Sequence, residues 1–136
     1  GEFSAGSEDG DRPLVVSYAS SPPVEVLFGD PDIEQAPTGA IVADDMCFRQ
    51  IEFAGILDGA ENVQAAELFI DFLISIDFQE DLPLQMFVFP VNPQAELPEI
   101  FVEHAQVPEN PVQMSIDEID ENREDWIRNW TRTILR

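Results

Sequence analysis

The residues best suited to chemistry lie in the segment Leu14–Pro23, which reads LVVSYASSPP and contains Tyr18, the only tyrosine of the chain. Three hydroxyl side chains, those of Ser17, Ser20 and Ser21, stand beside this ring in the sequence. Small-molecule sites combine aromatic walls with a few polar groups, so the segment is suited to binding a flat ring with a polar tail. On composition alone, a lone tyrosine packed in the core is the more frequent outcome.

The other reactive side chains are too few to form a catalytic centre. The chain has one histidine, His104, one cysteine, Cys47, and no lysine. Asp44 and Asp45 are adjacent, and neighbours on an extended chain point to opposite faces, so they do not form an acid–base pair. His104 has no cysteine or second histidine to complete a metal site. We therefore predict that the protein is not an enzyme and has no cofactor and no metal.

The charge of the chain is strongly one-sided. Its 28 acidic residues outnumber the 6 basic ones and give a formal net charge of -22. Such a field repels the phosphates of nucleic acids and attracts cations, so we expect no nucleic acid partner. From the charge alone, a solvated acidic surface without a ligand is the simpler interpretation.

Local patterns predict the strands that would position the tyrosine. Valines favour a strand at Leu14–Val16, and Pro22 and Pro23 cannot continue its ladder, so the strand ends where the hydroxyls begin. The carboxyl ends of strands in open α/β sheets border the ligand crevice. Further apolar strands are predicted at Cys47–Leu57 and Leu84–Asn92.

Helical periodicity is strongest at Gly59–Ile76, where Asn62 is the predicted N-cap. This helix is so apolar that we expect it to be nearly enclosed. A second helix is predicted at Ser75–Asp81, ending before Pro83. The remaining connections are a short helix or extended segment at Val24–Phe28, a surface loop at Gly29–Gly39, and an irregular stretch with one or two helical turns at Pro93–Met114.

A last helix is predicted to begin at the capping box Ser115–Glu118. Glu124 is expected to pair with Arg128 one turn later. Trp126 and Trp130 fall on the apolar face, and we expect them to anchor this helix to the rest of the fold.

Several of these segments together resemble one protein family. The run SYASSPP is similar to the S-Y-[ST]-x-S-P segment of bacterial thiamine-binding proteins, the substrate-binding components of ABC importers. Matches to CFRQIEFAGIL, AAELFIDFLISIDFQEDLP, MFVFPVN and a terminal REDWIRNWTRTI helix follow in the same order. The resemblance covers nearly the whole chain beyond Arg12, although the helix pair is shared with relatives that bind iron, phosphonates or polyamines.

The resemblance implies an α/β fold that is part of a two-lobed, type II periplasmic-binding-protein-like structure. Residues 1–12 are then an acidic flexible loop or a cloning remnant, 13–46 a portion of the second lobe, and 47–136 the hinge crossover and the helical return to the first lobe. It also implies that the amino-terminal lobe of the same protein is missing. The implied location is extracytoplasmic, in the periplasm or lipid-anchored at the cell surface, with an ABC permease in the membrane as partner.

The resemblance also implies a site for thiamine or a thiamine phosphate. Tyr18 would stack on the aromatic system of the ligand, and Ser17, Ser20 and Ser21, with neighbouring backbone amides, would hold its hydroxyl or phosphate end. Phe87 stands where the family commonly has a tryptophan and would close the pocket from the other lobe. Phenylalanine keeps the aromatic face and lacks the indole N–H, and a place in the core is its alternative.

Two alternatives remain open at this point. One keeps the importer role with another solute, namely ferric iron, a phosphonate or a polyamine; a single tyrosine argues against iron, which such proteins usually hold with paired tyrosines. The other is a stand-alone acidic interaction domain. Neighbouring genes for a permease and an ATPase would favour the importer.

Overall fold

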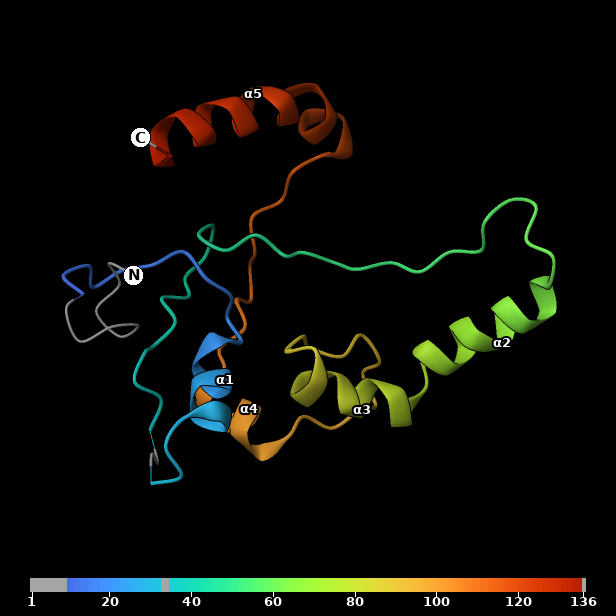
Figure 1. The fold of residues 1–136 in the computed structure, drawn as a ribbon, viewed down its shortest axis with the longest axis horizontal. Coiled ribbons are helices and arrows are strands. Elements are labelled where there is room, and N and C mark those ends of the chain that lie inside the picture. Colours follow the sequence, from blue (N-terminus) through green and yellow to red (C-terminus); the bar gives the residue numbers. More distant parts are fainter. Residues whose placement is uncertain (1–9, 33–34, 136) are drawn as a thin grey trace. The chain divides into compact units, whose positions relative to one another are not determined.

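The computed structural model describes residues 10–32 and 35–135, and its regular elements are helices (Figure 1). The acidic loop predicted over residues 1–12 lies outside the described residues except for 10–12. Between the helices the described chain is mostly extended or turning. The helices are, in chain order, α1 (Ser21–Phe28), α2 (Val63–Leu73), α3 (Ile76–Gln85), α4 (Glu99–His104) and α5 (Ile116–Ile134).

The predicted strands are not paired into a sheet within the described residues. Leu14–Val16 has no regular structure, and Cys47–Leu57 takes part only through an isolated parallel bridge between Phe48 and Val112. The start of the strand predicted at Leu84–Asn92 belongs instead to α3. A strand needs a neighbour along its length to satisfy its backbone groups, and in the described chain the bridge at Phe48 does not extend into a ladder. The α/β class and the two-lobed architecture therefore stay predictions.

The chain divides into two compact units. The first combines the residues up to Val42 with Ile51–Val107 and contains α1 to α4. The second combines Ala43–Gln50 with Pro108–Arg136 and contains α5. No helix in the described part of the chain is both long and apolar enough to cross a membrane.

The core of the first unit lies where α1 packs against α4. Phe101 of α4 is 1% exposed, and its ring meets that of Phe89 edge to face with 5.8 Å between centroids. Pro23 of α1 is also fully buried. The structure selects the helical alternative for Val24–Phe28 and confirms a short helix within Pro93–Met114.

The caps predicted for α2 and α3 are confirmed. Asn62 accepts a hydrogen bond from the backbone N–H of Ala65 at 3.0 Å, and Ser75 accepts one from that of Phe78 at 3.4 Å. However, α3 runs past Pro83 to Gln85, so the predicted end is wrong. Proline in a helix removes the bond to the carbonyl four residues earlier, and burial of the ring offsets part of that loss.

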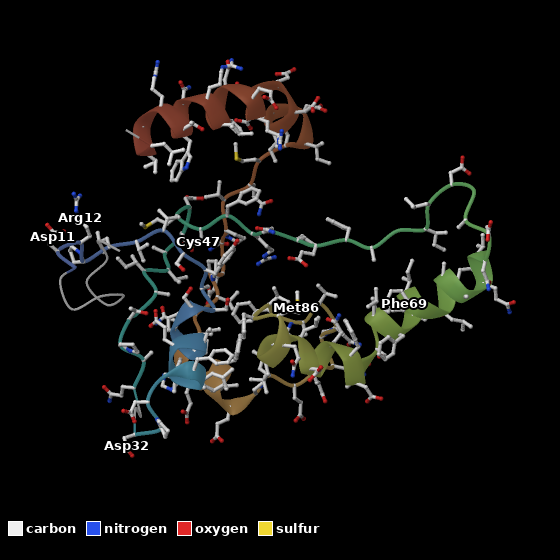
Figure 2. All side chains as sticks on the ribbon, in the orientation of Figure 1. Asp11, Arg12, Asp32, Cys47, Phe69 and Met86 are labelled. Atoms are coloured by element: carbon white, nitrogen blue, oxygen red, sulfur yellow. The ribbon has the colours of Figure 1, made fainter. Side chains whose placement is uncertain are left out.

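The expectation that α2 is nearly enclosed is wrong for the described chain. None of its described residues is buried, and Phe69 and Phe72 are 59% and 50% exposed. Phe69 is labelled on α2 in Figure 2. An aromatic contact joins the helix to its successor, because the ring centroids of Phe72 and Phe78 lie 5.1 Å apart. Periodicity identifies an apolar face correctly, but the number of neighbours that cover it depends on the tertiary structure.

A buried glutamine links α2, α3 and the segment that follows them. Gln79 is 4% exposed; its Nε2 donates to the carbonyl of Leu73 at 2.7 Å, and its Oε1 accepts from the N–H of Val91 at 2.6 Å. The side chain of Asn92 donates to the carbonyl of Ile74 at 2.9 Å. These bonds fix the chain that runs from α3 past Phe89 toward α4.

The second unit is held by backbone and side-chain bonds between its two segments. The N–H of Val112 donates to the carbonyl of Cys47 at 2.8 Å, and the N–H of Asp45 donates to the carbonyl of Asn110 at 3.2 Å. Asn110 also donates to the carboxylate of Asp44 at 3.2 Å. The Cys47 thiol is half-buried.

Helix α5 begins as predicted, because Ser115 accepts a hydrogen bond from the N–H of Glu118 at 3.1 Å. The predicted pair of Glu124 with Arg128 is wrong: Arg128 pairs with Asp125, and Glu124 with its neighbour Arg123. Both alternatives are exposed ion pairs of small energy, so local rotamers decide between them. Trp126 and Trp130 are 41% and 57% exposed, and the anchoring expected of them stays a prediction.

Candidate ligand site

A pocket of about 230 Å³ lies in the first unit at the start of α1. Its walls are mainly apolar and it is partly open to solvent. One part of the wall comes from the segment leading into α1 and from α1 itself, and the other comes from the turn that follows α3. The residues that line it are Tyr18, Ser20, Ser21, Val24, Glu25 and Phe87.

Tyr18 lies at the pocket with its side chain largely free. The residue is 71% exposed, so it is not part of the core of the described chain. Its carbonyl accepts the N–H of Ser21 at 3.0 Å, which forms a turn directly before α1. Because this turn fixes the backbone while the ring stays exposed, the phenol is available to a ligand that enters the pocket.

Phe87 reaches the same pocket from a residue with unusual backbone geometry. Its φ is 59°, in the left-handed region that bulky residues rarely adopt. The ring meets Phe28 edge to face with 5.7 Å between centroids. Strained backbone persists where surrounding contacts hold it, and such positions cluster at functional sites. Both Tyr18 and Phe87 lie in the first unit and line the same pocket, and the closure of that pocket by two lobes stays a prediction.

The strain at Phe87 gives a test that separates ring from backbone. Phe87→Gly and Phe87→Ala both remove the ring, but only glycine adopts a φ near +60° without steric cost. We expect Phe87→Gly to be about 1 kcal/mol more stable than Phe87→Ala, as measured by urea denaturation of the purified protein. An alanine variant as stable as the glycine variant would show that this backbone is unstrained.

Two of the three predicted serines line the pocket. Ser20 is 7% exposed, and Ser21 is half-buried. Ser17 is not among the lining residues; its hydroxyl lies 2.6 Å from that of Ser21, so it orients a lining residue. The predicted set is therefore brought together except for Ser17.

The first turn of α1 has no free backbone N–H to donate to a phosphate, although such amides were expected to hold one. The N–H of Ser21 is bonded to the carbonyl of Tyr18, and that of Val24 to the carbonyl of Ser20 at 3.4 Å. Pro22 and Pro23, which lie between them, have no N–H. The prolines were expected to end a strand; they begin a helix instead, because the first turn loses no internal bond to a missing N–H.

Sequence reasoning missed two lining residues, Val24 and Glu25, of which Glu25 is the polar one. Its carboxylate accepts a hydrogen bond from the hydroxyl of Thr38, which holds it in place. Within the described residues, no arginine or histidine forms an ion pair with it. The available signal was spacing, because Glu25 follows Ser21 by four residues and shares its face once α1 is helical.

No group of three or more histidine, cysteine or acidic side chains is placed to hold a metal ion among residues 10–32 and 35–135. His104 closes α4, with its Nε2 3.7 Å from the carboxylate of Glu103. The pocket therefore offers aromatic faces, two hydroxyls and one carboxylate. This combination suits a small cation that carries an aromatic ring.

Comparison with known proteins relates the chain to the thiamine-binding periplasmic proteins. Those of Escherichia coli K12 and Salmonella typhimurium LT2 are each 27% identical to it over 127 residues, which is 93% of the chain. The chain spans 37% of the length of each relative. No family model and no solved structure matches. The chain is thus a distant homologue of these two proteins and matches about a third of their length.

Proposed function

We propose that the chain is part of an extracytoplasmic solute-binding protein of an ABC importer, and that the ligand is thiamine or one of its phosphates. The proposed location is the periplasm, or the cell surface by way of a lipid anchor. The permease of the importer and an amino-terminal lobe of the same protein are the proposed partners. Both relatives bear the name thiamine-binding periplasmic protein, which supports this proposal.

One observation carries the proposal. Tyr18 and Phe87 are far apart in the sequence, and both belong to segments that resemble thiamine-binding proteins. They line the same pocket, together with two hydroxyls. A site built from both of these segments requires them to meet at one surface, and the shared pocket meets that requirement.

The pocket suits the chemistry of thiamine. A thiazolium cation placed over the Tyr18 ring gains about 0.5 to 2 kcal/mol beyond burial, depending on how far the contact is desolvated. The faces of Tyr18 and Phe87 supply apolar area for the two rings, and Ser20 and Ser21 supply partners for the hydroxyethyl group. A ligand makes all of these contacts at once only when it lies against the lining residues of this pocket.

The small size of the pocket supports the proposal that another part of the protein, the amino-terminal lobe, completes it. At about 230 Å³ it is smaller than usual ligand pockets, which have volumes of about 300 to 1,000 Å³. An open pocket of this size holds one side of a ligand and leaves the other to solvent. Closure of an amino-terminal lobe over the ligand would exclude that water and raise the affinity.

Titration of the whole protein with thiamine, followed by tryptophan fluorescence, tests the proposal. We expect saturable binding, and weaker binding when residues 10–135 are titrated alone, because one wall then faces solvent. Ferric iron, a phosphonate and spermidine serve as competing solutes. Tight binding of one of them in place of thiamine would reject the ligand, and tight thiamine binding by the isolated chain would reject the shared pocket.

A further inference from the structure

We propose that Gln79 is a positioning residue of the ligand site, which holds residues 87–90 in the place where the Phe87 ring lines the pocket. Gln79 is not itself among the lining residues. The inference rests on the proposed function, and it adds a residue outside the pocket on which the affinity for the ligand depends. It uses the backbone geometry of Phe87, the hydrogen bonds at the two ends of residues 87–90, and the burial of Gln79.

The backbone at Phe87 needs support from outside the residue. Its φ of 59° lies in the left-handed region, which is unfavourable for a bulky side chain. Such a conformation persists only where the surrounding structure holds it, and a return to an extended φ would turn the ring out of its present direction. The ring has an edge-to-face contact with Phe28, and a single aromatic pair is a weak constraint. The backbone must therefore be held by other bonds.

Hydrogen bonds hold both ends of this segment. Before it, the N–H of Met86 donates to the last turn of α3 at 2.8 Å. After it, the Oε1 of Gln79 accepts from the N–H of Val91 at 2.6 Å and from the N–H of Asn92 at 3.3 Å. Residues 87–90 lie between these bonds and have no regular secondary structure. Their course therefore depends on where the two ends are fixed, and Gln79 fixes one of them.

Gln79 is itself firmly held. It is 4% exposed, and its Nε2 donates to the carbonyl of Leu73 at 2.7 Å, so both ends of its carboxamide are bonded. The carboxamide cannot rotate without breaking one of these bonds. The side chain of Asn92 donates to the carbonyl of Ile74 at 2.9 Å and secures the same end of the segment. The acceptor oxygen of Gln79 is thus a fixed point for the chain that carries Phe87.

Removal of this oxygen has a consequence for the pocket. The N–H groups of Val91 and Asn92 would then bond to water, and residues 87–90 would be held firmly at one end only. The backbone of Phe87 is then free to leave the left-handed region, which relieves its strain and displaces the ring. A ligand would lose contact with one aromatic face although no lining residue has been replaced.

Calorimetric titration of the whole protein with thiamine tests the inference with two substitutions of Gln79. Gln79→Met has a similar length and no acceptor oxygen, and we expect it to bind thiamine about 10-fold more weakly. Gln79→Glu keeps an oxygen for the N–H of Val91 and loses the donor to Leu73, so it should bind within about 3-fold of the unaltered protein although it is less stable. A purely structural role would instead weaken binding in both variants, in proportion to their loss of stability.

The matched control is Gln85→Met, which should leave the affinity unchanged. Gln85 is exposed and lies closer to Phe87 in the sequence, and it is not the residue that binds Val91 and Asn92. Circular dichroism checks that each variant is folded at the temperature of the titration. If Gln79→Met does not fold, Gln79→Asn takes its place, because its shorter side chain withdraws the same oxygen.

A double-mutant cycle shows whether Gln79 acts through Phe87. Phe87→Ala removes the ring and should lower the affinity for thiamine by about 10-fold. In that background, Gln79→Met should lower it further by no more than about 2-fold, because the ring that Gln79 positions is absent. Losses that multiply in the double variant would overturn the inference.

The other outcomes separate the inference from the proposed function. If Gln79→Met binds thiamine as tightly as the unaltered protein, the inference is overturned and the proposed function stands. The same holds if Gln79→Met and Gln79→Glu lose affinity equally. If the unaltered protein does not bind thiamine, the proposed function fails and the inference fails with it.

Discussion

Replacing Tyr18 by alanine is expected to lower the affinity of the whole protein for thiamine by about 10- to 100-fold. The ring supplies both the apolar face and the cation–π attraction, and each factor of ten corresponds to about 1.4 kcal/mol. Since Tyr18 is 71% exposed, its truncation should leave the fold intact. Fluorescence or calorimetric titration with thiamine measures the change.

Two variants show whether the ring itself is responsible. Tyr18→Phe keeps the aromatic face and should bind thiamine within about 3-fold of the unaltered protein. Leu14→Ala shortens a side chain in the same segment that is also 71% exposed, and it should have no effect. Unchanged binding by Tyr18→Ala would remove the ring from the site.

The second large effect is on stability, where Gln79→Ala is expected to lower the free energy of unfolding by about 2 to 4 kcal/mol. The substitution leaves the carbonyl of Leu73 and the N–H of Val91 without the partners they have now, and each lost partner at such a part-buried bond costs about 1 to 2 kcal/mol. Urea denaturation monitored by circular dichroism measures the loss.

The matched control is Gln85→Ala, at the exposed end of the same helix, for which we expect a change within about 0.5 kcal/mol. Gln79→Glu keeps the acceptor for Val91 but replaces the donor to Leu73 with a second acceptor. It should therefore be destabilised as well. Equal stability of Gln79→Ala and Gln85→Ala would mean that the three segments are held by other contacts.

Local chemistry made the helix starts predictable. The caps at Asn62, Ser75 and Ser115 depend only on residues within one turn, and all three form as expected. The strands depend on pairing between distant segments, which local propensity does not contain. Pro83 shows a similar limit, because burial lets the helix continue through a residue that usually ends one.

The candidate site was predictable only in part, because its residues come from segments that are distant in the sequence. Family resemblance pointed to Tyr18 and Phe87, whereas neither periodicity nor composition would have joined two residues so far apart. Glu25 was missed because its position depends on α1, and the sequence left helix and extended chain open there. The left-handed backbone of Phe87 was hidden by an apolar run that favours a strand.

The uncovered apolar face of α2 has a consequence for the behaviour of the chain in solution. Phe69 and Phe72 expose apolar side chains to water, which favours self-association of the protein. The net negative charge of each copy opposes this association by electrostatic repulsion. A high salt concentration screens the electrostatic repulsion and does not weaken the hydrophobic attraction between the apolar surfaces. We therefore expect the protein to be monomeric at low salt concentration and to self-associate as the salt concentration rises.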